Sequence, residues 1–313
     1  MTHAQTKIAR SRFTLPFALL YGVGIWALAN MGQERWWVQF ACFILSVGLM
    51  AELNNANLLI RIYSRIVSTA FIVLTCAAAF LFPSLQGSVS QVLFIASLLM
   101  LYRGYQDKDS MGTAFYAFLF IGLASLGQVH ILCLVPVLWV VMAFFIYSLS
   151  VRTFMASLLG LLIPYWALLA RIVTLGGNDF QPWAAHFLAL GDFAFPFDYL
   201  TLTLPQILLF FFLILLGTTG CIHYLRTSFY DKIRVRQIFY SFIFIGTATM
   251  LMLAVQPQHY DLLIRVMIVM VSPLIGHFLA LTDTKLTNIY FHVILALAIV
   301  ITCISLWMSS SIF

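Results

Sequence analysis

The side chains of this sequence best suited to binding a metal ion or relaying protons are its histidines, which are His3, His130, His186, His223, His259, His277 and His292. Metal enzymes of membranes commonly carry histidine pairs three or four residues apart, because this spacing aims two imidazoles of one helix at one ion. The two closest histidines of this chain, His277 and His292, are 15 residues apart. The spacing therefore predicts neither a bound metal nor another cofactor.

Three of the histidines, His223, His277 and His292, are nevertheless expected at one depth in a membrane. His277 lies near the end of one apolar segment, His292 lies near the start of the next, antiparallel one, and His223 ends a third. Imidazoles from three helices could bind a metal ion or relay protons. The alternative is that each ring forms hydrogen bonds with a neighbouring helix or with lipid headgroups.

Charged residues near the opposite ends of the apolar segments form a second candidate site, which comprises Glu34, Arg35, Arg171, Asp261 and Arg265. Asp261 and Arg265 are four residues apart and can pair on one face of a helix. A cation inside an apolar segment is costly unless it is paired or faces a polar cavity. Arginines placed in this way could bind the phosphate of a lipid-linked substrate. Alternatively, the Arg265 side chain extends to the membrane interface and pairs there with Asp261.

The composition identifies the kind of element that carries these residues. Apolar residues make up 63% of the chain and charged residues 8%, and the mean hydropathy is +1.03. Soluble domains are about half apolar and about a quarter charged, so a soluble fold is excluded. The net charge of +6 resides in short loops between apolar segments, where it indicates membrane orientation and not a nucleic-acid site.

The apolar segments predict one all-α domain over residues 1–313, a polytopic transmembrane helix bundle. A helix needs about 20 apolar residues to cross a membrane, and irregular backbone cannot face lipid. The first segment follows three basic residues and resembles a cleavable signal peptide, but we expect an uncleaved helix because many spans follow. About eleven spans are predicted, at 13–30, 36–52, 66–83, 86–102, 111–128, 129–149, 154–175, 204–224, 238–256, 262–281 and 287–308.

The count of spans depends on the segment 110–151, which contains 42 residues and none of Lys, Arg, Asp or Glu. A single helix of this length would be about 60 Å long, twice the thickness of the hydrocarbon layer. The segment must therefore fold back on itself. We expect the turn at 127–130, where the sequence reads GQVH.

The distribution of basic residues supports this hairpin, because cytoplasmic loops are enriched in Lys and Arg. With a cytoplasmic N-terminus and an external C-terminus, only Arg35, Arg171 and Arg265 lie on the outer side. Reading 110–151 as one span would reverse every later loop. The inner side holds the other thirteen basic residues, Lys7, Arg10, Arg12, Arg61, Arg65, Arg103, Lys108, Arg152, Arg226, Lys232, Arg234, Arg236 and Lys285.

Two connections are longer than the others. The outer loop 176–203 is acidic and rich in aromatic residues, which is typical of a segment lying on the membrane surface. The inner loop 225–237 is basic and can attract anionic headgroups. Membrane lipids are therefore the expected partners, and a nucleic acid is not.

A succession of short motifs resembles a known family. It comprises Phe82-Pro83, Leu101-Tyr102-Arg103, GLASL at 122–126, Pro136, Arg152 and GLLIPY at 160–165. The resemblance is to an uncharacterised family of bacterial polytopic inner-membrane proteins with a domain of unknown function, some of which are labelled β-carotene 15,15′-monooxygenase. It implies a multi-pass protein of the bacterial inner membrane with no established activity. The carotenoid label would require several histidines converging on iron, and His223, His277 and His292 are the possibility that this chain offers.

These observations leave three classes of function open. The first is a protein of envelope biogenesis that handles an amphiphilic or lipid-linked molecule. The second is a membrane enzyme, either a His-iron carotenoid oxygenase or a lipid-linked glycosyl transferase. The latter typically has an acidic residue in its first external loop, where Glu34 lies, but the loop 31–35 is short for such an enzyme. The third is a secondary transporter, which the absence of an inverted repeat disfavours.

Overall fold

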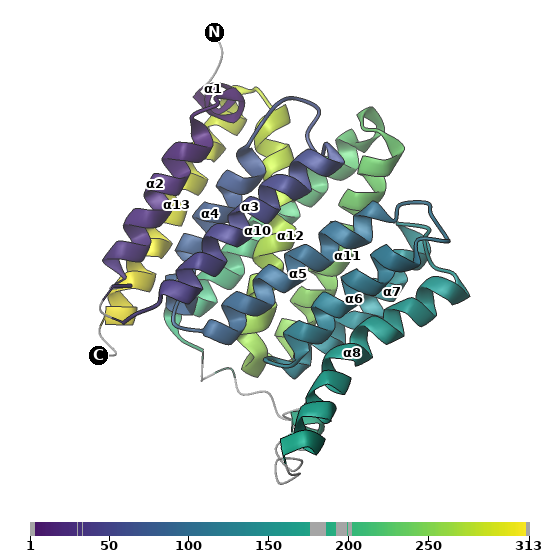
Figure 1. The fold of residues 1–313 in the computed structure, drawn as a ribbon. Coiled ribbons are helices and arrows are strands. Elements are labelled where there is room, and N and C mark those ends of the chain that lie inside the picture. Colours follow the sequence, from purple (N-terminus) through teal and green to yellow (C-terminus); the bar gives the residue numbers. More distant parts are fainter. Residues whose placement is uncertain are drawn as a thin grey trace.

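The computed structural model describes residues 4–29, 31–32, 34–175, 186–191, 199 and 202–310, with the side chains of residue 4 and of residues 171–175 and 308–310 left out. Within these residues the structure is helical and contains no strand (Figure 1). The α-helices are α1 (Ala4–Arg10), α2 (Thr14–Leu28), α3 (Trp37–Asn57), α4 (Ile66–Ala77), α5 (Leu85–Arg103), α6 (Met111–Ser125), α7 (Val135–Phe144), α8 (Val151–Leu175), α10 (Leu204–Thr227), α11 (Ile233–Val255), α12 (Tyr260–Leu281) and α13 (Lys285–Ser310). Short 3-10 helices are η1 (Ala79–Leu81), η2 (Val129–Leu134), η3 (Ala189–Gly191), η4 (Ser228–Tyr230) and η5 (Pro257–His259).

Each of the eleven predicted spans coincides with a helical segment. In the described part of the chain, seven helices are long and apolar enough to cross a membrane. The other four apolar segments are shorter, at Thr14–Leu28, Ile66–Ala77, Met111–Ser125 and Val129–Phe144. The predicted all-α membrane bundle is therefore confirmed in its helical architecture, whereas the count of eleven crossings stays a prediction.

Helix α12 forms the centre of the bundle. It packs against α4, α5, α10 and α11 (Figure 1). All residues of its most apolar stretch are buried inside the protein. A helix that is apolar on every side requires such surroundings. Arg265, Ser272 and His277 on α12 are consequently held in the protein interior.

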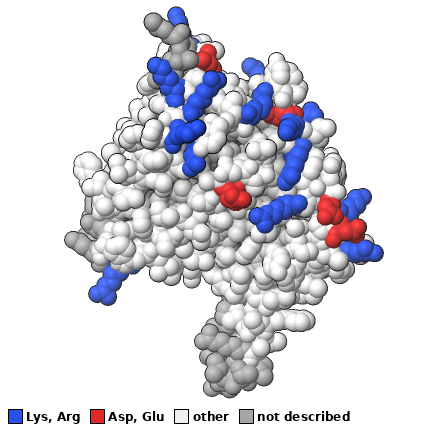
Figure 2. Space-filling model, turned by 45° about the horizontal axis from the view of Figure 1, so that its top comes forward, with Lys and Arg blue, Asp and Glu red and all other residues white. Residues whose placement is uncertain are grey.

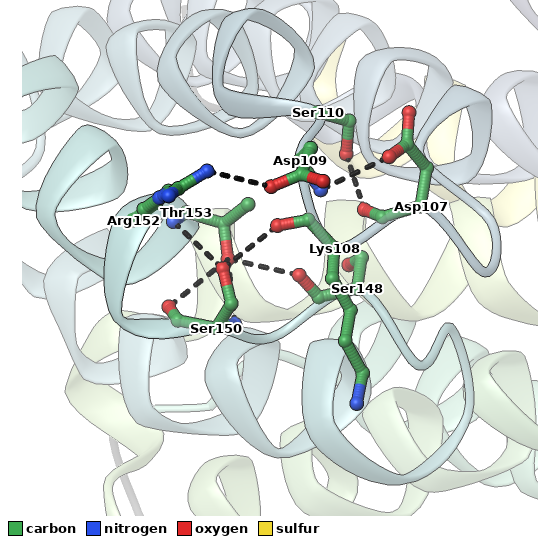
Figure 3. A network of polar contacts seen from close by, with 8 residues as sticks. All are labelled: Asp107, Lys108, Asp109, Ser110, Ser148, Ser150, Arg152 and Thr153. Carbon is green, nitrogen blue, oxygen red and sulfur yellow. Dashed lines mark hydrogen bonds and ion pairs between the residues drawn. The ribbon is translucent and has the colours of Figure 1, made fainter.

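The predicted hairpin within 110–151 is confirmed. α6 ends at Ser125, a turn follows at 126–128, and η2 and α7 return the chain. The two ends of the segment meet, since the Ser150 hydroxyl donates to the Lys108 carbonyl oxygen (2.8 Å) and Arg152 Nη1 pairs with Asp109 Oδ1 (3.1 Å; Figure 3). The residues flanking the segment therefore lie at the same end of the bundle.

Basic side chains gather at one end of the bundle. Figure 2 shows most of the Lys and Arg side chains in view over the end that lies at the top of Figure 1. α1 lies at this end, whereas α13 finishes at the opposite end (Figure 1). The distribution agrees with the grouping of cations that the loop pattern predicts.

The two longer loops differ from their predicted outlines. α10 continues to Thr227 and α11 begins at Ile233, so most of the basic loop 225–237 is helical. The helices extend because their polar ends reach beyond the apolar layer, which hydropathy alone does not register. Most of the outer loop 176–203 lies outside the described residues. Within its described part, His186 Nε2 lies 2.8 Å from the Ser125 carbonyl oxygen, next to the hairpin turn.

Close packing of α8 on α6 depends on glycine. A Cβ atom added to Gly160 would overlap the carbonyl oxygen of Phe115 and lie 3.0 Å from the Leu119 nitrogen. We predict that Gly160→Ala destabilises the bundle by about 1–3 kcal/mol, because the two backbones must separate. Alanine favours a helix over glycine by about 1 kcal/mol, so propensity alone predicts the opposite sign.

Gly112→Ala on α6 is the matched control, since its added Cβ would meet nothing within 4 Å. Unfolding of both variants in detergent mixtures of increasing sodium dodecyl sulfate content measures the difference. Equal stability of the two variants would show that α6 and α8 do not pack as described.

Candidate functional site

Helix α12 positions two polar clusters. Asp261 and Arg265 lie in its first turns, and His277 lies near its end. Arg265 and His277 are twelve residues apart, which corresponds to about 18 Å along the helix axis. Each cluster is completed by side chains from other helices and connections. We call the first the arginine cluster and the second the histidine cluster.

The guanidinium of Arg265 is bound inside the protein. Its side chain is 5% exposed, and Nε donates to Asp261 Oδ1 at 2.9 Å. Nη1 donates to Gln91 Oε1 (3.2 Å) and Nη2 donates to the Leu81 carbonyl oxygen (2.6 Å). The predicted pairing of Asp261 with Arg265 is present. The Arg265 side chain turns inward to these partners and does not extend to the surface of the bundle.

The second carboxylate oxygen of Asp261 binds the start of α5 and the hairpin turn. Oδ2 accepts hydrogen bonds from the Ser84 hydroxyl (2.7 Å) and from Gln128 Nε2 (3.1 Å). Gly87 makes room for this approach, since a Cβ atom there would overlap Asp261 Oδ2. The partners of this ion pair therefore come from several parts of the chain. They lie on η1, on α5 and the residue before it, and in the hairpin turn, whereas the pair itself belongs to α12.

The other predicted members of the outer site lie elsewhere. Glu34 and Arg35 are exposed between α2 and α3, and no contact among the described residues joins either of them to Asp261 or Arg265. Arg171 belongs to α8, but its side chain lies outside the described residues. Within the described side chains, the structure thus assembles the outer site only in part.

The histidine cluster joins α12 to two connections, the one between α3 and α4 and the one between α10 and α11. Nε2 of the fully buried His277 lies 3.2 Å from Asp231 Oδ2, and Arg61 Nε lies 2.8 Å from Asp231 Oδ1. The Asp231 side chain is 1% exposed. A carboxylate only accepts hydrogen bonds, so His277 Nε2 carries a proton. The other ring nitrogen, Nδ1, is buried without a protein partner.

His223 completes this cluster and His292 does not. The ring centroids of His223 and His277 are 5.6 Å apart, and His223 Nε2 is also buried without a protein partner. His292 is exposed on α13, with Nδ1 2.7 Å from the Asn288 carbonyl oxygen of its own helix. Two of the three histidines expected at this depth therefore meet. Across the described residues, no three His, Cys, Asp or Glu side chains are arranged to hold a metal ion.

Several residues of the two clusters are not predicted from the sequence as members of a site. Asp231 is the one acid in the basic segment 225–237, which is a signal that sequence reading could have used. Arg61 was counted only as an orientation signal. Ser84, Gln91 and Gln128 carry no signal, because uncharged polar residues are common throughout the chain.

Two apolar grooves flank the central helix. The first lies between α2 and α13, and we call it the α2–α13 groove. It has a volume of about 280 Å³, and α4 and α12 contribute to its wall. The groove between α10 and α11, here the α10–α11 groove, has a volume of about 200 Å³, and α12 contributes to its wall. A third cavity, beside Arg265, is lined by both apolar and polar residues, and its volume of about 10 Å³ is at the lower limit for holding one water molecule.

No protein-family model, curated protein or solved structure matches this chain. The family resemblance of the segment 80–165 therefore stays a prediction.

Removal of the buried cation tests the arginine cluster. We predict that Arg265→Met destabilises the protein by about 3 kcal/mol, because it removes the cation from the Asp261 carboxylate and leaves Asp261 Oδ1 and the Leu81 carbonyl oxygen without their donor. This value is at the low end for a broken buried pair, since the Asp261 side chain is 30% exposed. Detergent unfolding followed by circular dichroism measures the loss.

Arg152→Gln is the matched control, because the Arg152–Asp109 pair is 72% and 78% exposed. Exposed pairs contribute at most about 1 kcal/mol. A loss for Arg265→Met no larger than that for Arg152→Gln would contradict the role assigned to the arginine cluster.

Proposed function

We propose that this protein binds an anionic amphiphile from the inner leaflet of a bacterial inner membrane, as part of envelope biogenesis. The α2–α13 groove is the observation that carries this proposal. It is almost entirely apolar, with Ala70 and Val73 of α4 and Ala298 of α13 among its lining residues. Such a wall suits a hydrocarbon chain and offers little to a polar solute.

The groove is bounded at both ends. The Tyr21 hydroxyl and Thr302 Oγ1 are 3.1 Å apart and link α2 to α13 towards the outer side. At the inner end, Gln5 of α1 donates to the Leu279 carbonyl oxygen (2.9 Å) and to Thr282 Oγ1 (2.8 Å). α1 is thereby fixed across the end of the groove. A chain of limited length, entering between α2 and α13, fits this enclosure.

The inner end of the α2–α13 groove is cationic. Lys7 and Arg10 are exposed on α1, and Arg12 is exposed just before α2. Ile8 and Thr14, which are neighbours of these cations in the sequence, line the groove. Basic residues at the membrane surface attract anionic headgroups. An amphiphile with its chain in the groove would therefore place an anionic headgroup beside α1.

The other functions considered have less support. Secondary transport requires a polar cavity near the middle of the membrane, whereas the two large grooves among the described residues are apolar. Glycosyl transfer through Glu34 is supported only by the exposure of that residue on the predicted outer side. An iron-dependent oxygenase would draw on the histidine cluster, in which two of the three expected imidazoles meet.

We also propose eleven crossings, with a cytoplasmic N-terminus and an external C-terminus. The eleven helical segments and the opposite positions of α1 and the end of α13 (Figure 1) support this topology. Alkaline phosphatase fused after residue 310 should be active, since this reporter folds only outside the cytoplasm. Green fluorescent protein fused at the same site should be dark, and a fluorescent, phosphatase-negative pair would contradict the topology.

Filling the groove tests the proposed function. We predict that Ala70→Phe removes most of the binding of spin-labelled phosphatidylglycerol, because the ring occupies the space of the lipid chain. The fraction of motionally restricted lipid, measured by electron paramagnetic resonance in vesicles, is the readout. Ala167→Phe is the matched control, since Ala167 is exposed on α8 and does not line the groove.

The basic residues beside the α2–α13 groove allow a second test, of the charge of the ligand. Replacing Lys7, Arg10 and Arg12 with Gln should reduce the preference for phosphatidylglycerol over phosphatidylcholine by about tenfold. The same replacement at Arg103, Arg226 and Lys232, which are also exposed but do not line the groove, should leave the preference unchanged. Equal binding of both lipids by the unmodified protein would refute an anionic ligand.

A further inference from the structure

Two histidines stack on each other at the end of the bundle that holds the arginine cluster. The ring centroids of His130 and His259 are 3.5 Å apart, and the ring planes differ by 26°. We call this pair the histidine stack. His130 belongs to η2, which follows the hairpin turn, and His259 is the last residue of η5, which precedes α12. The histidine stack therefore joins the returning arm of the hairpin to the start of the central helix.

A hydrogen bond of the arginine cluster joins the same two segments. Gln128 Nε2 donates to Asp261 Oδ2 at 3.1 Å. Gln128 lies two residues before His130, and Asp261 lies two residues after His259. A change in the histidine stack is therefore transmitted to the arginine cluster over two residues of chain on either side.

The hydrogen bonds of the two rings determine which nitrogens carry protons. His130 Nε2 lies 3.0 Å from the carbonyl oxygen of Ala189, which only accepts, so this nitrogen carries a proton. His259 Nε2 lies 3.2 Å from Gln258 Nε2, an amide nitrogen that also donates to Gln256 Oε1 (2.9 Å). An amide nitrogen only donates, so His259 Nε2 carries no proton. His259 is therefore neutral in this arrangement.

Protonation has different consequences for the two histidines. His130 can take up a second proton and still donate from Nε2 to Ala189. In a protonated His259, Nε2 would be a donor facing the donor of Gln258. The added charge would also lie against the His130 ring, and two charged imidazoles at a centroid distance of 3.5 Å repel each other. The histidine stack thus excludes a charge on His259.

The other ionisable groups near the histidine stack do not reverse this argument. Asp261 is the acid described on the segments that meet here, and Arg265 Nε balances its charge at 2.9 Å. His186 Nε2 donates to a carbonyl oxygen, which it can do in either charge state. The hydroxyls of Tyr199 and Tyr260 donate to backbone carbonyl oxygens and stay neutral at acid pH.

We propose that the histidine stack is a pH-sensitive contact, which holds the hairpin on the start of α12 at neutral pH and releases it at acid pH. In the topology proposed above this end faces outwards, so the contact responds to the acidity of the external medium. Neither ring lines the α2–α13 groove. The failure of this proposal would therefore leave the proposed function standing, and the reverse also holds.

The direction of the effect follows from the ordinary pKa of histidine, about 6.5. Above this pH an unstacked His259 is neutral, and stacking requires no loss of a proton. Below it, stacking must remove a proton from His259. The stacked form is therefore disfavoured by up to about thirtyfold at about pH 5 relative to about pH 7.5.

Hydrogen–deuterium exchange of the full-length protein in lipid nanodiscs tests this contact. The backbone amides of Gln128, Ile131 and His259 donate to carbonyl oxygens of these turns, so their exchange reports opening. After correction for the intrinsic pH dependence of exchange, we expect these amides to exchange about ten- to thirtyfold faster at about pH 5 than at about pH 7.5. The connection 282–284, at the opposite end of α12, should show no such change.

Variants identify the group that titrates. His259→Phe keeps a ring for stacking and cannot be protonated, so its exchange should be the same at both pH values; His259→Gln replaces this variant if it fails to fold. His130→Phe removes one of the two like charges and should reduce the response without abolishing it, because the hydrogen bond from Gln258 still requires a neutral His259. His292→Phe, at an exposed position on α13, is the matched control and should retain the full response.

Two outcomes would overturn the proposal. Corrected exchange rates that do not differ between the two pH values in the unmodified protein would show that the histidine stack is not sensitive to pH. A full response in His259→Phe would assign the sensitivity to another group, such as His186. Ala70→Phe, which fills the α2–α13 groove, should leave the response intact because that groove does not include the histidine stack.

Discussion

The arrangement of the bundle depends on the burial of charge along α12. Moving an ion from water into a protein interior costs several kcal/mol even after relaxation, so each buried charge must find partners. Arg265 obtains them from Asp261, Gln91 and Leu81, and Asp231 obtains them from Arg61 and His277. These partners lie on different helices and connections. The requirement to satisfy the two clusters therefore fixes the positions of the elements that surround α12.

Close approach of backbones allows this arrangement. Gly87 leaves space for the Asp261 carboxylate, and Gly220 brings α10 onto the backbone of Leu274. Where the surrounding helices diverge, apolar grooves remain, one between α2 and α13 and one between α10 and α11. The α2–α13 groove reaches α1, where Lys7 and Arg10 are exposed.

Both grooves are lined almost entirely by apolar side chains. Their walls match hydrocarbon chains. A bundle with a closed centre and lateral grooves is suited to binding lipids from the bilayer, whereas a soluble cargo would need an aqueous path. The Tyr21–Thr302 contact and the hydrogen bonds of Gln5 limit the length of chain that the α2–α13 groove can hold.

Sequence alone determined the features that depend on local spacing. Apolar length predicted the helical segments, the uncharged stretch 110–151 predicted its hairpin, and the four-residue spacing predicted the Asp261–Arg265 pair. Tertiary structure decided which distant residues meet. Asp231 and His277 are 46 residues apart, and Arg265 and Gln91 are 174 apart. Such contacts depend on how helices rotate and dock, and an apolar helix has no strong periodicity that reveals which face turns inward. The sequence predicted that His292 lies at the depth of His277, and the packing of α13 leaves His292 exposed and outside the histidine cluster.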